Sequence, residues 1–540
     1  MTRLPTQLWV FTFCCAWIAL PSVLWGEERP LRQRIDAEVR AAWEREQITP
    51  AGLADDAAFL RRVYLDLVGC VPSYDEVRQF LQDNDPQKRA KVIDRLLDDP
   101  RFADHQANVW DQVLFGRHPL NPEATRKRDS FKKWLSGKFT RNEPYDRWVR
   151  ELLRAEEEGS ELFYVQFRNQ PEEATVAVSR IFLGTQLQCA RCHDHPFENW
   201  TQRDFYGMAG FFVRLVVLDN GGSGNQRRYT IGEKATGEVL FTGAVKDQKP
   251  GQKGEPVKPK FLLGPVLDEP PLPAGYKEPD ARTAKTLPKP PFSRKEKLAE
   301  WVTARDNPFF ARAVANRVWA QFLGRGLVHP VDDLGEHNLP SHPELLQTLT
   351  DELLAHGFDL KWLIRELVNS QTYQLASTGP STEALPRWYE RARVRPLSAE
   401  ELLASFRQAT GYDNANPNRP DGRLPNATEE YFLIFFGEPT NGLGEFQGSL
   451  SEHLFLNNSG QVWQFVQRRK GNLADVLLSS TEPWEQRVDR LFLSILSRLP
   501  SAKERQAFVA HLNSADGKAE ARVAEAIWAL INSSEFRFNH

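Results

Sequence analysis

The stretch RVYLDLVGCVPSYDEVRQF (residues 62–80) decides the fold class, because apolar side chains recur in it at helical spacing on both sides of a turn. The helical pattern breaks after Val68, and Pro72 and Ser73 follow. Ser73 and Glu76 form the S-x-x-E sequence of a capping box, in which each side chain bonds to the backbone N–H of the other residue. The stretch predicts two helices joined by a tight turn.

A second copy of this stretch lies near the end of the chain, where residues 490–508 read RLFLSILSRLPSAKERQAF. The two copies align without a gap, and the capping box recurs as Ser501 and Glu504. Two copies are too few for a solenoid. We therefore interpret them as one helix–turn–helix packing unit that is used twice.

Helical spacing also marks the rest of residues 31–218 and 293–540, and the sequence predicts a mainly α protein with two helical domains. Residues 219–292 differ, because they contain Gly- and Pro-rich runs such as GGSG and PPLPAG. The short apolar runs EVLFTGAV (238–245) and KFLLG (260–264) favour a small antiparallel β insertion, which a linker follows.

Two local patterns in the second domain add detail to this prediction. Ser341 and Glu344 form a further capping box, with Pro343 early in the expected helix. The aromatic run YFLIFFGEP (431–439) fits either a buried strand or a helical turn.

The composition excludes several classes of protein. Of the 540 residues, 41% are hydrophobic, which is enough for sizeable cores and excludes global disorder. The 69 Lys and Arg residues nearly balance the 72 Asp and Glu residues, so the chain has no charge signature of nucleic-acid binding. Five cysteines are too few for a disulfide-rich scaffold.

Residues 1–26 have the order of a secretory signal peptide, with Arg3 before an apolar run that extends from Leu8 to Leu20. We expect cleavage after Gly26 and export to the periplasm or another extracytoplasmic compartment; the alternative is a retained N-terminal anchor. No later segment approaches ~20 continuous apolar residues, so we expect no transmembrane segment after signal cleavage.

Two of the three cysteines beyond the signal lie in Cys189-Ala190-Arg191-Cys192-His193, which has the C-x-x-C-H spacing of c-type haem attachment. Each thiol can form a thioether at one porphyrin edge, and the adjacent imidazole then reaches the iron. Cys189 and Cys192 are therefore predicted to anchor haem c, with His193 as the proximal ligand. The third cysteine, Cys70, is expected to be a small buried hydrophobe.

A haem also needs an apolar pocket that limits access of water. Seven apolar side chains near the motif are candidates for its walls: Phe182, Leu187, Phe197, Trp200, Phe205, Phe211 and Phe212. No distal iron ligand is evident. Met208 is expected in the core, and the remote histidines are His105, His118 and His342.

Three other interpretations of the motif stay open. The first is zinc, because the cysteines and histidines of residues 189–195 are all admissible ligands, although four ligands would crowd into this short segment. The second is a disulfide between Cys189 and Cys192 in an oxidising compartment. The third is a pair of free, redox-active thiols.

His195 precedes Pro196, which disfavours the α conformation at the residue before it. We expect a helix through Cys192 to end here, so that His195 does not share the iron face with His193. Asp194 and His195 are predicted to support the metal site, with the His195 ring orienting a carboxylate of Asp194 or Glu198 or a haem propionate.

The run HPVDDLGEH (329–337) offers further carboxylates and histidines for a metal site, but we favour a polar loop between helices. The sequence contains no nucleophile elbow, P-loop, zincin or dinucleotide-binding motif. It therefore identifies no catalytic residue and leaves open whether the protein is an enzyme.

The segment QLQCARCHDHPFENWTQRDFYGMAGFF (186–212) resembles the hallmark of the planctomycete proteins called cytochrome c-associated, which pair two domains of unknown function. Residues 48–81 resemble a further part of the first domain, and residues 307–335 and 340–373 resemble the second. Many members carry an additional cytochrome c domain. The motif positions that the resemblance implies in the second domain are Asn316, Arg317, Trp319, Gly324, Gly326, Ser341, His342, Pro343 and Glu344.

The sequence thus supports two functions of different classes. The first is an exported haem c-binding protein in electron transfer or a haem-linked redox step, which would act with a redox partner protein. The second is an extracytoplasmic binding or scaffold protein, for example for polysaccharides, in which residues 189–195 form a structural zinc site or a disulfide.

Overall fold

The computed structural model describes most of the chain beyond the predicted signal peptide: residues 29–117, 128–222, 227–243, 254–281, 284–379, 385–413, 426–436, 450–514 and 518–540. The predicted signal peptide (1–26) and His118 lie outside this part of the chain. The described residues are mainly helical, which confirms the predicted fold class.

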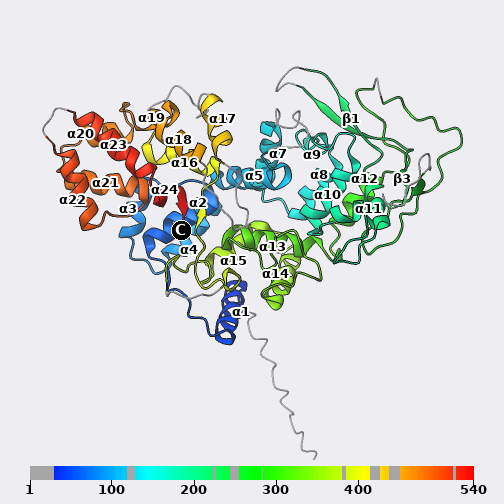
Figure 1. Ribbon diagram of the computed structural model, residues 1–540, viewed down its shortest axis with the longest axis horizontal. Coiled ribbons are helices and arrows are strands. Elements are labelled where there is room, and N and C mark those ends of the chain that lie inside the picture. The colour runs from blue at the N-terminus through cyan, green and yellow to red at the C-terminus, as the bar shows by residue number, and fades with distance from the viewer. Residues whose placement is uncertain are drawn as a thin grey trace, which may run out of the picture.

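The first half of the chain contributes helices to the centre of the molecule and to one of its two lobes (Figure 1). These helices are α1 (Leu31–Arg45), α2 (Asp56–Val68), α3 (Tyr74–Gln82), α4 (Lys88–Leu97), α5 (Pro100–Phe115), α7 (Arg128–Thr140), α8 (Tyr145–Arg154), α9 (Leu162–Val165), α10 (Pro171–Leu183), the 3₁₀ turn η1 (Gln188–Arg191) and α11 (Gln202–Ala209).

The second half contributes α12 to the same lobe, and its other helices to the base of the molecule and to the other lobe (Figure 1). They are α12 (Arg294–Val302), α13 (Phe310–Leu323), α14 (Pro343–Ala355), α15 (Leu360–Asn369), the 3₁₀ turn η4 (Pro386–Trp388), α16 (Ala399–Thr410), α17 (Asn426–Phe435), α18 (Leu450–Asn458), α19 (Gly460–Val466), α20 (Leu473–Ser479), α21 (Trp484–Leu496), α22 (Ala502–Leu512), α23 (Ala519–Ile531) and α24 (Ser534–Arg537). The aromatic run at 431–439 is thus helical as far as Phe435.

Three small antiparallel sheets, each of two strands, complete the described part of the chain. The pairs are β1 (Leu215–Asp219) with β2 (Tyr229–Glu233), β3 (Val239–Phe241) with β4 (Glu255–Val257), and β5 (Arg395–Pro396) with β6 (Phe538–Asn539). Strands β2, β3 and β4 lie inside residues 219–292, where a β insertion is predicted, but β1 lies almost wholly before residue 219, in a stretch predicted to be helical.

One of the two predicted strands in this insertion is wrong. The run at 260–264 does not extend, because the Gly264 N–H donates to the Phe261 carbonyl at 3.0 Å and closes a turn. Only an isolated bridge between Lys260 and Val266 remains there.

Buried apolar side chains form two clusters. The larger cluster contains residues from before 218 and from after 293, so the two predicted helical domains share one core. The smaller is formed by residues between 397 and 536, together with Leu65 and Val71. The domain boundaries at 218 and 293 stay a prediction.

Both copies of the helix–turn–helix unit form as predicted. Helices α2 and α3 make the first and α21 and α22 the second, and both capping boxes are present. Gly69 (φ 70°) and Ser497 (φ 60°) take the left-handed conformation directly after the first helix of each copy. Cys70 is buried as expected, and burial raises the pKa of its thiol to about 11.

The capping box predicted at Ser341 is wrong. Helix α14 begins at Pro343, and its N-cap is His342, whose side chain makes no capping bond. Ser341 therefore lies one residue too early, and its hydroxyl instead lies 3.0 Å from Nδ1 of His342. Pro343 does occupy the first turn, where its missing N–H costs nothing.

Two buried arginines of α2 connect the beginning of the chain to its end. Arg61 donates to the carbonyls of Ile495 (3.2 Å) and Phe536 (2.8 Å). Arg62 donates to the carbonyls of Tyr373 (2.7 Å) and Leu375 (2.8 Å). Burial lowers the pKa of Arg61 to about 10, and these bonds to carbonyls compensate for the water that it loses.

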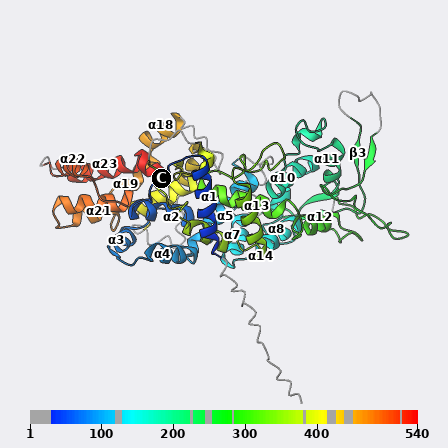
Figure 2. The same ribbon diagram turned by 90° about the horizontal axis from the view of Figure 1, so that it is seen from below.

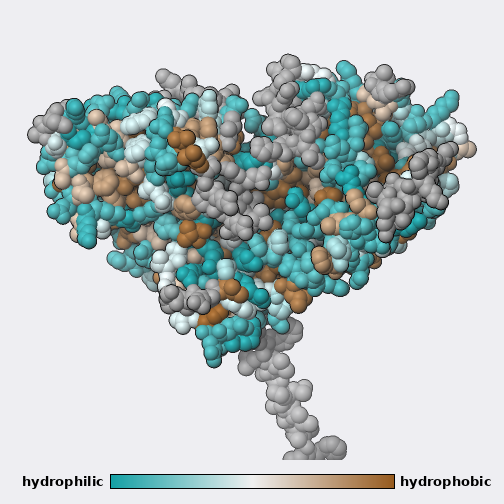
Figure 3. Space-filling view, viewed as in Figure 1, coloured by the Kyte–Doolittle hydropathy of each residue, from teal (hydrophilic) through white to brown (hydrophobic). Residues whose placement is uncertain are grey.

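The two lobes lie side by side above a shared base. Helices α16 to α23 form one lobe, α8 to α12 and strands β1 to β4 form the other, and α1 and α13 to α15 lie at the base (Figure 1). The view from below shows that the molecule is elongated along the axis that joins the lobes (Figure 2). The face in Figure 3 is mostly hydrophilic, and its apolar side chains occur in small patches. Within the described ranges no helix combines the length and apolarity that a membrane crossing needs.

Candidate functional site

The C-x-x-C-H segment lies at the surface, directly after α10. This helix ends at Gly184, which has φ 60°, and the chain then forms η1. Ala190 is buried and anchors the turn, whereas Cys189 is half-buried and Cys192 is exposed. Both cysteines are free thiols. The turn thus leaves both cysteines at least partly accessible to solvent.

The His193 ring is oriented by its own backbone neighbour. Its Nδ1 lies 2.7 Å from the Asp194 carbonyl, and the residue is exposed. An Nδ1–H that donates to a carbonyl leaves Nε2 as the free lone pair, which is how a metal-binding histidine is commonly fixed. The Asp194 carboxylate accepts the Gln202 N–H at 2.9 Å, which attaches the segment to the start of α11.

His195 closes the turn that follows. Its N–H donates to the Trp200 carbonyl at 2.8 Å, and its Nδ1 accepts the N–H groups of Phe197 (3.3 Å) and Glu198 (3.0 Å). The ring therefore positions Glu198 through the backbone, whereas the Glu198 carboxylate has another partner.

That partner is His337, which belongs to the polar loop at 329–337. Its Nδ1 contacts the Glu198 carboxylate, and its backbone N–H donates to the same carboxylate at 3.3 Å. Its Nε2 lies 3.2 Å from Asp333. We call the three side chains Glu198, His337 and Asp333 the histidine clasp. It joins the C-x-x-C-H region to a loop 139 residues away in sequence.

The charges of the clasp support one another. The hydrogen bond that His337 donates to Glu198 raises the pKa of His337, and Asp333 adds to this effect. Burial opposes ionisation of Glu198, but the hydrogen bonds from His337 outweigh it and lower the pKa of this carboxyl. Both shifts favour the charged pair at mildly acidic pH.

Three hydrogen bonds with two other segments fix the loop that carries His337. The buried Asn316 amide donates to the carbonyls of Val328 (2.9 Å) and Val331 (3.2 Å). The Leu334 N–H donates to the Gly184 carbonyl at 2.8 Å, which ties the loop to the end of α10. Asn316, which the resemblance marks as a motif position, thus has a structural role in holding this loop.

The apolar pocket predicted around the motif is not formed by most of its candidate residues. Five of the seven are buried in the core, and they are Phe182, Leu187, Phe205, Phe211 and Phe212. Met208 is buried there as well, as expected. Trp200 is half-buried against Phe309, with ring centroids 6.3 Å apart, and only Phe197 is largely exposed, at 74%. The prediction fails because helical spacing does not distinguish a core side chain from one that lines a pocket.

The two remote histidines that the structure describes are buried elsewhere. His105 lies 3.9 Å from Glu401, and burial lowers its pKa. His342 packs against Trp388 and Tyr389, and burial lowers its pKa to about 4.

The residues of the motif do not converge as a zinc site does. Among the described residues, no group of three or more His, Cys, Asp or Glu side chains is arranged to hold a metal ion. A covalently attached haem makes a smaller demand, namely two thiols and one free imidazole nitrogen. The donor set of Cys189, Cys192 and His193 fits that demand, whereas the predicted apolar enclosure is reduced to Phe197 and Trp200.

The protein is therefore mainly helical, and the histidine clasp connects its surface C-x-x-C-H segment to a loop of the second domain. Residues 34–216 match a family model described as a protein of unknown function (DUF1549), and residues 294–442 match one described as a protein of unknown function (DUF1553). The chain thus carries the two paired domains that the resemblance predicts. The motif and Glu198 lie in the first, and Asp333 and His337 lie in the second. No curated protein and no solved structure matches the chain.

Proposed function

We propose that the protein is exported and carries haem c on Cys189 and Cys192, with His193 as the proximal iron ligand, and that it acts in electron transfer. One observation carries this proposal: the Asp194 carbonyl occupies Nδ1 of His193 at 2.7 Å and leaves Nε2 free, next to two unbridged thiols. When bound, the haem would supply one-electron chemistry, and the chain would supply attachment and the proximal ligand.

The position of the motif supports transfer to a partner protein. Cys192, His193 and Asp194 are exposed, and Phe197 beside them offers a large apolar surface. A redox partner that covers Phe197 would also exclude water from the haem edge and so adjust its reduction potential.

His195 and Asp194 orient the site without holding the iron. His195 fixes the turn that carries Phe197 and Glu198, and Asp194 holds the segment on α11. His195→Ala should therefore keep covalent haem and shift its reduction potential or spin state. His193→Ala should keep the thioethers and lose the native iron ligation.

The experiment is to express the whole chain with its own leader in a host that attaches haem c, and to record the absorbance spectrum of the exported protein. We expect a Soret band and a haem-sized mass on the peptide that contains residues 189–193. Cys192→Ser should reduce covalent attachment, and Cys70→Ala should leave it unchanged because Cys70 is buried in the core.

The absence of both signals, in cells where a co-expressed cytochrome c matures, would falsify the haem proposal. Thiol counting then identifies the alternative. A disulfide leaves one reactive thiol after denaturation, whereas a zinc site releases three thiols when the metal is chelated.

A further inference from the structure

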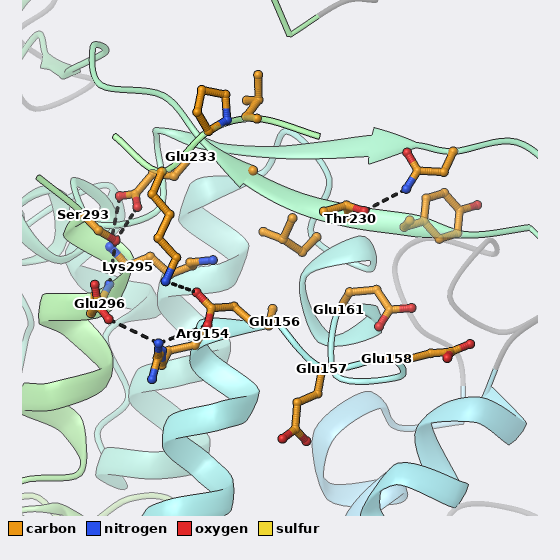
Figure 4. Close-up of a pocket in the computed structure, with 18 of the residues that line it drawn as sticks. Arg154, Glu156, Glu157, Glu158, Glu161, Thr230, Glu233, Ser293, Lys295 and Glu296 are labelled. Atoms are coloured by element: carbon orange, nitrogen blue, oxygen red, sulfur yellow. Dashed lines mark hydrogen bonds and ion pairs between the residues drawn. The ribbon is translucent and has the colours of Figure 1, made fainter. Parts of the chain in front are cut away.

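A cavity of about 840 Å³ lies in the lobe that α8 to α12 form, between the end of α8, strand β2 and the start of α12 (Figure 4). No residue of the C-x-x-C-H segment lines it. Its walls carry an excess of carboxylates over cations. The carboxylates are Glu156, Glu157, Glu158, Glu161, Glu233 and Glu296, and the cations are Arg154, Arg228, Lys289 and Lys295.

Two of these cations are neutralised by neighbouring carboxylates. The Lys289 ammonium lies 2.9 Å from Glu156, and Arg154 lies 3.3 Å from Glu296. Figure 4 shows the pair of Arg154 and Glu296.

Lys295 differs from them. Its side chain is only 7% exposed and points from the start of α12 into the cavity (Figure 4). Its backbone N–H donates to Glu233 at 3.1 Å, which fixes the residue in place. Its amino group has no hydrogen-bond or ion-pair partner among the residues that the structure describes.

The surroundings of Lys295 favour the uncharged amine. Burial lowers its pKa, and attraction by Glu233 and Glu156 offsets this effect only in part. A buried lysine with a free, uncharged amine is a nucleophile that forms imines with carbonyl compounds.

The walls restrict the kind of carbonyl compound that fits. Carboxylates accept hydrogen bonds from hydroxyl groups, and Glu158 and Glu161 lie across the cavity from Lys295 (Figure 4). Glu157 lies on the same side, but its carboxylate already pairs with Lys138 at 2.8 Å. The excess of carboxylates disfavours an anionic ligand.

We propose that Lys295 binds a neutral, hydroxyl-rich aldehyde or ketone in this cavity as an imine. The amine attacks the carbonyl carbon and forms a carbinolamine, which loses its oxygen as water when the C=N bond forms. No oxidant or reductant is consumed. The proposal is independent of the haem proposal, because it concerns other residues and another cavity.

The test uses glyceraldehyde as the probe, with the whole chain at pH 7 and cyanoborohydride to reduce any imine to a stable amine. Peptide mass mapping then locates the label. Lys297 is the internal reference, since it lies on the same helix with its side chain 45% exposed. A lowered pKa leaves more of the amine uncharged at pH 7, and the pKa of Lys297 is raised by Glu300, so we expect Lys295 to be labelled faster than Lys297.

Three variants and one second probe make the result specific. Lys295→Arg and Lys295→Met should abolish the fast label, and Lys297→Met should leave it unchanged. Propanal lacks the hydroxyl groups, so it should label Lys295 more slowly than glyceraldehyde does. Labelling of Lys295 no faster than that of Lys297 would overturn the imine site, and equal rates with both aldehydes would overturn the preference for hydroxyl groups.

Discussion

Two groups of ion pairs connect the first domain to the second. A histidine lies at the centre of one group, and an arginine lies at the centre of the other. The histidine clasp is partly exposed, and its central residue is His337. In the second group the two carboxylates are buried, and the central residue is the half-buried Arg395, which donates to Asp66 (2.8 Å) and to both oxygens of Glu401 (2.8 Å each). We call this second group the arginine junction.

The two groups of ion pairs differ in how the charge of the central side chain responds to pH. The guanidinium of Arg395 stays charged at any ordinary pH, and it holds the pKa of Glu401 below its usual value although burial raises it. The imidazole of His337 loses its charge as pH rises through its raised pKa. The ion pairs of the arginine junction therefore persist over the ordinary pH range, whereas those of the histidine clasp change with pH.

The largest expected effect comes from breaking the arginine junction. Arg395→Met leaves Asp66 and Glu401 buried without their counter-charge, which should cost about 3–5 kcal/mol of unfolding free energy. The measurement is the urea midpoint followed by tryptophan fluorescence.

Arg365→Met is the matched control. Its pair with Asp94 is exposed, with side-chain exposures of 38% and 57%, so the loss should stay below about 1 kcal/mol. If the two variants had similar urea midpoints, the arginine junction would contribute no more to stability than an exposed ion pair does.

The next effect concerns the loop that carries the histidine clasp. Gly184 has φ 60°, and a Cβ there would lie 2.1 Å from Cδ1 of Leu334. Gly184→Ala should therefore cost about 1–3 kcal/mol and push the loop away from α10. Thermal unfolding measures the cost, and hydrogen exchange of the Leu334 amide measures the movement.

Gly357→Ala separates the clash from the backbone strain. Gly357 has φ 62°, but a Cβ there meets nothing within 4 Å. It should lower the melting temperature less than Gly184→Ala does and leave the exchange of Leu334 unchanged. If both substitutions lowered the melting temperature equally, the contact between residue 184 and Leu334 would make no contribution to the effect.

The smallest effect is the pH dependence of the histidine clasp. Because the pKa of His337 is raised on folding, its contribution is complete below its ordinary value of about 6.5 and is lost as pH rises through the raised value. The pKa of Glu198 is lowered, so its contribution is present above the ordinary carboxyl value and is lost as pH falls through the lowered one. His337→Gln should therefore lower the free energy of unfolding most at pH values between these two limits, by about 1 kcal/mol or less.

Gly335→Ala tests the same contact without changing a charged residue. A Cβ at this position would lie 2.1 Å from Oε1 of Glu198, so the flexible carboxylate must move away from His337. NMR titration should then show the pKa of His337 falling toward about 6.5, with little change in melting temperature. An unchanged titration curve would contradict the role of Glu198.

Local features of the fold could be read from the sequence, and contacts between distant segments could not. The helix–turn–helix copies and their capping boxes depend on residues within a few positions of one another, such as Ser73 and Glu76. The same holds for the C-x-x-C-H segment. The histidine clasp depends on Glu198 and His337 meeting across 139 residues, and nothing in either segment predicts the other.

Two further failures have physical reasons. Phe205 and Phe211 have the spacing of a helix face, and that spacing is the same whether the face meets a core or a cofactor. The capping box predicted at Ser341 is wrong by one residue, because His342 is the N-cap of α14 and Pro343 is the first residue of that helix. Lys295 carried no sequence signal, since only the fold removes it from water and from its counter-ions.

The two arginines of α2 have a consequence for the order of events during synthesis. Arg61 donates to the carbonyl of Ile495, 434 residues further along the chain. At about 5–20 residues per second, a ribosome needs roughly 20–90 seconds to make that distance. During this interval the guanidinium stays hydrated, and the apolar face of α2 lacks its final partners. The nascent chain therefore presents this helix to chaperones until its last segments have emerged.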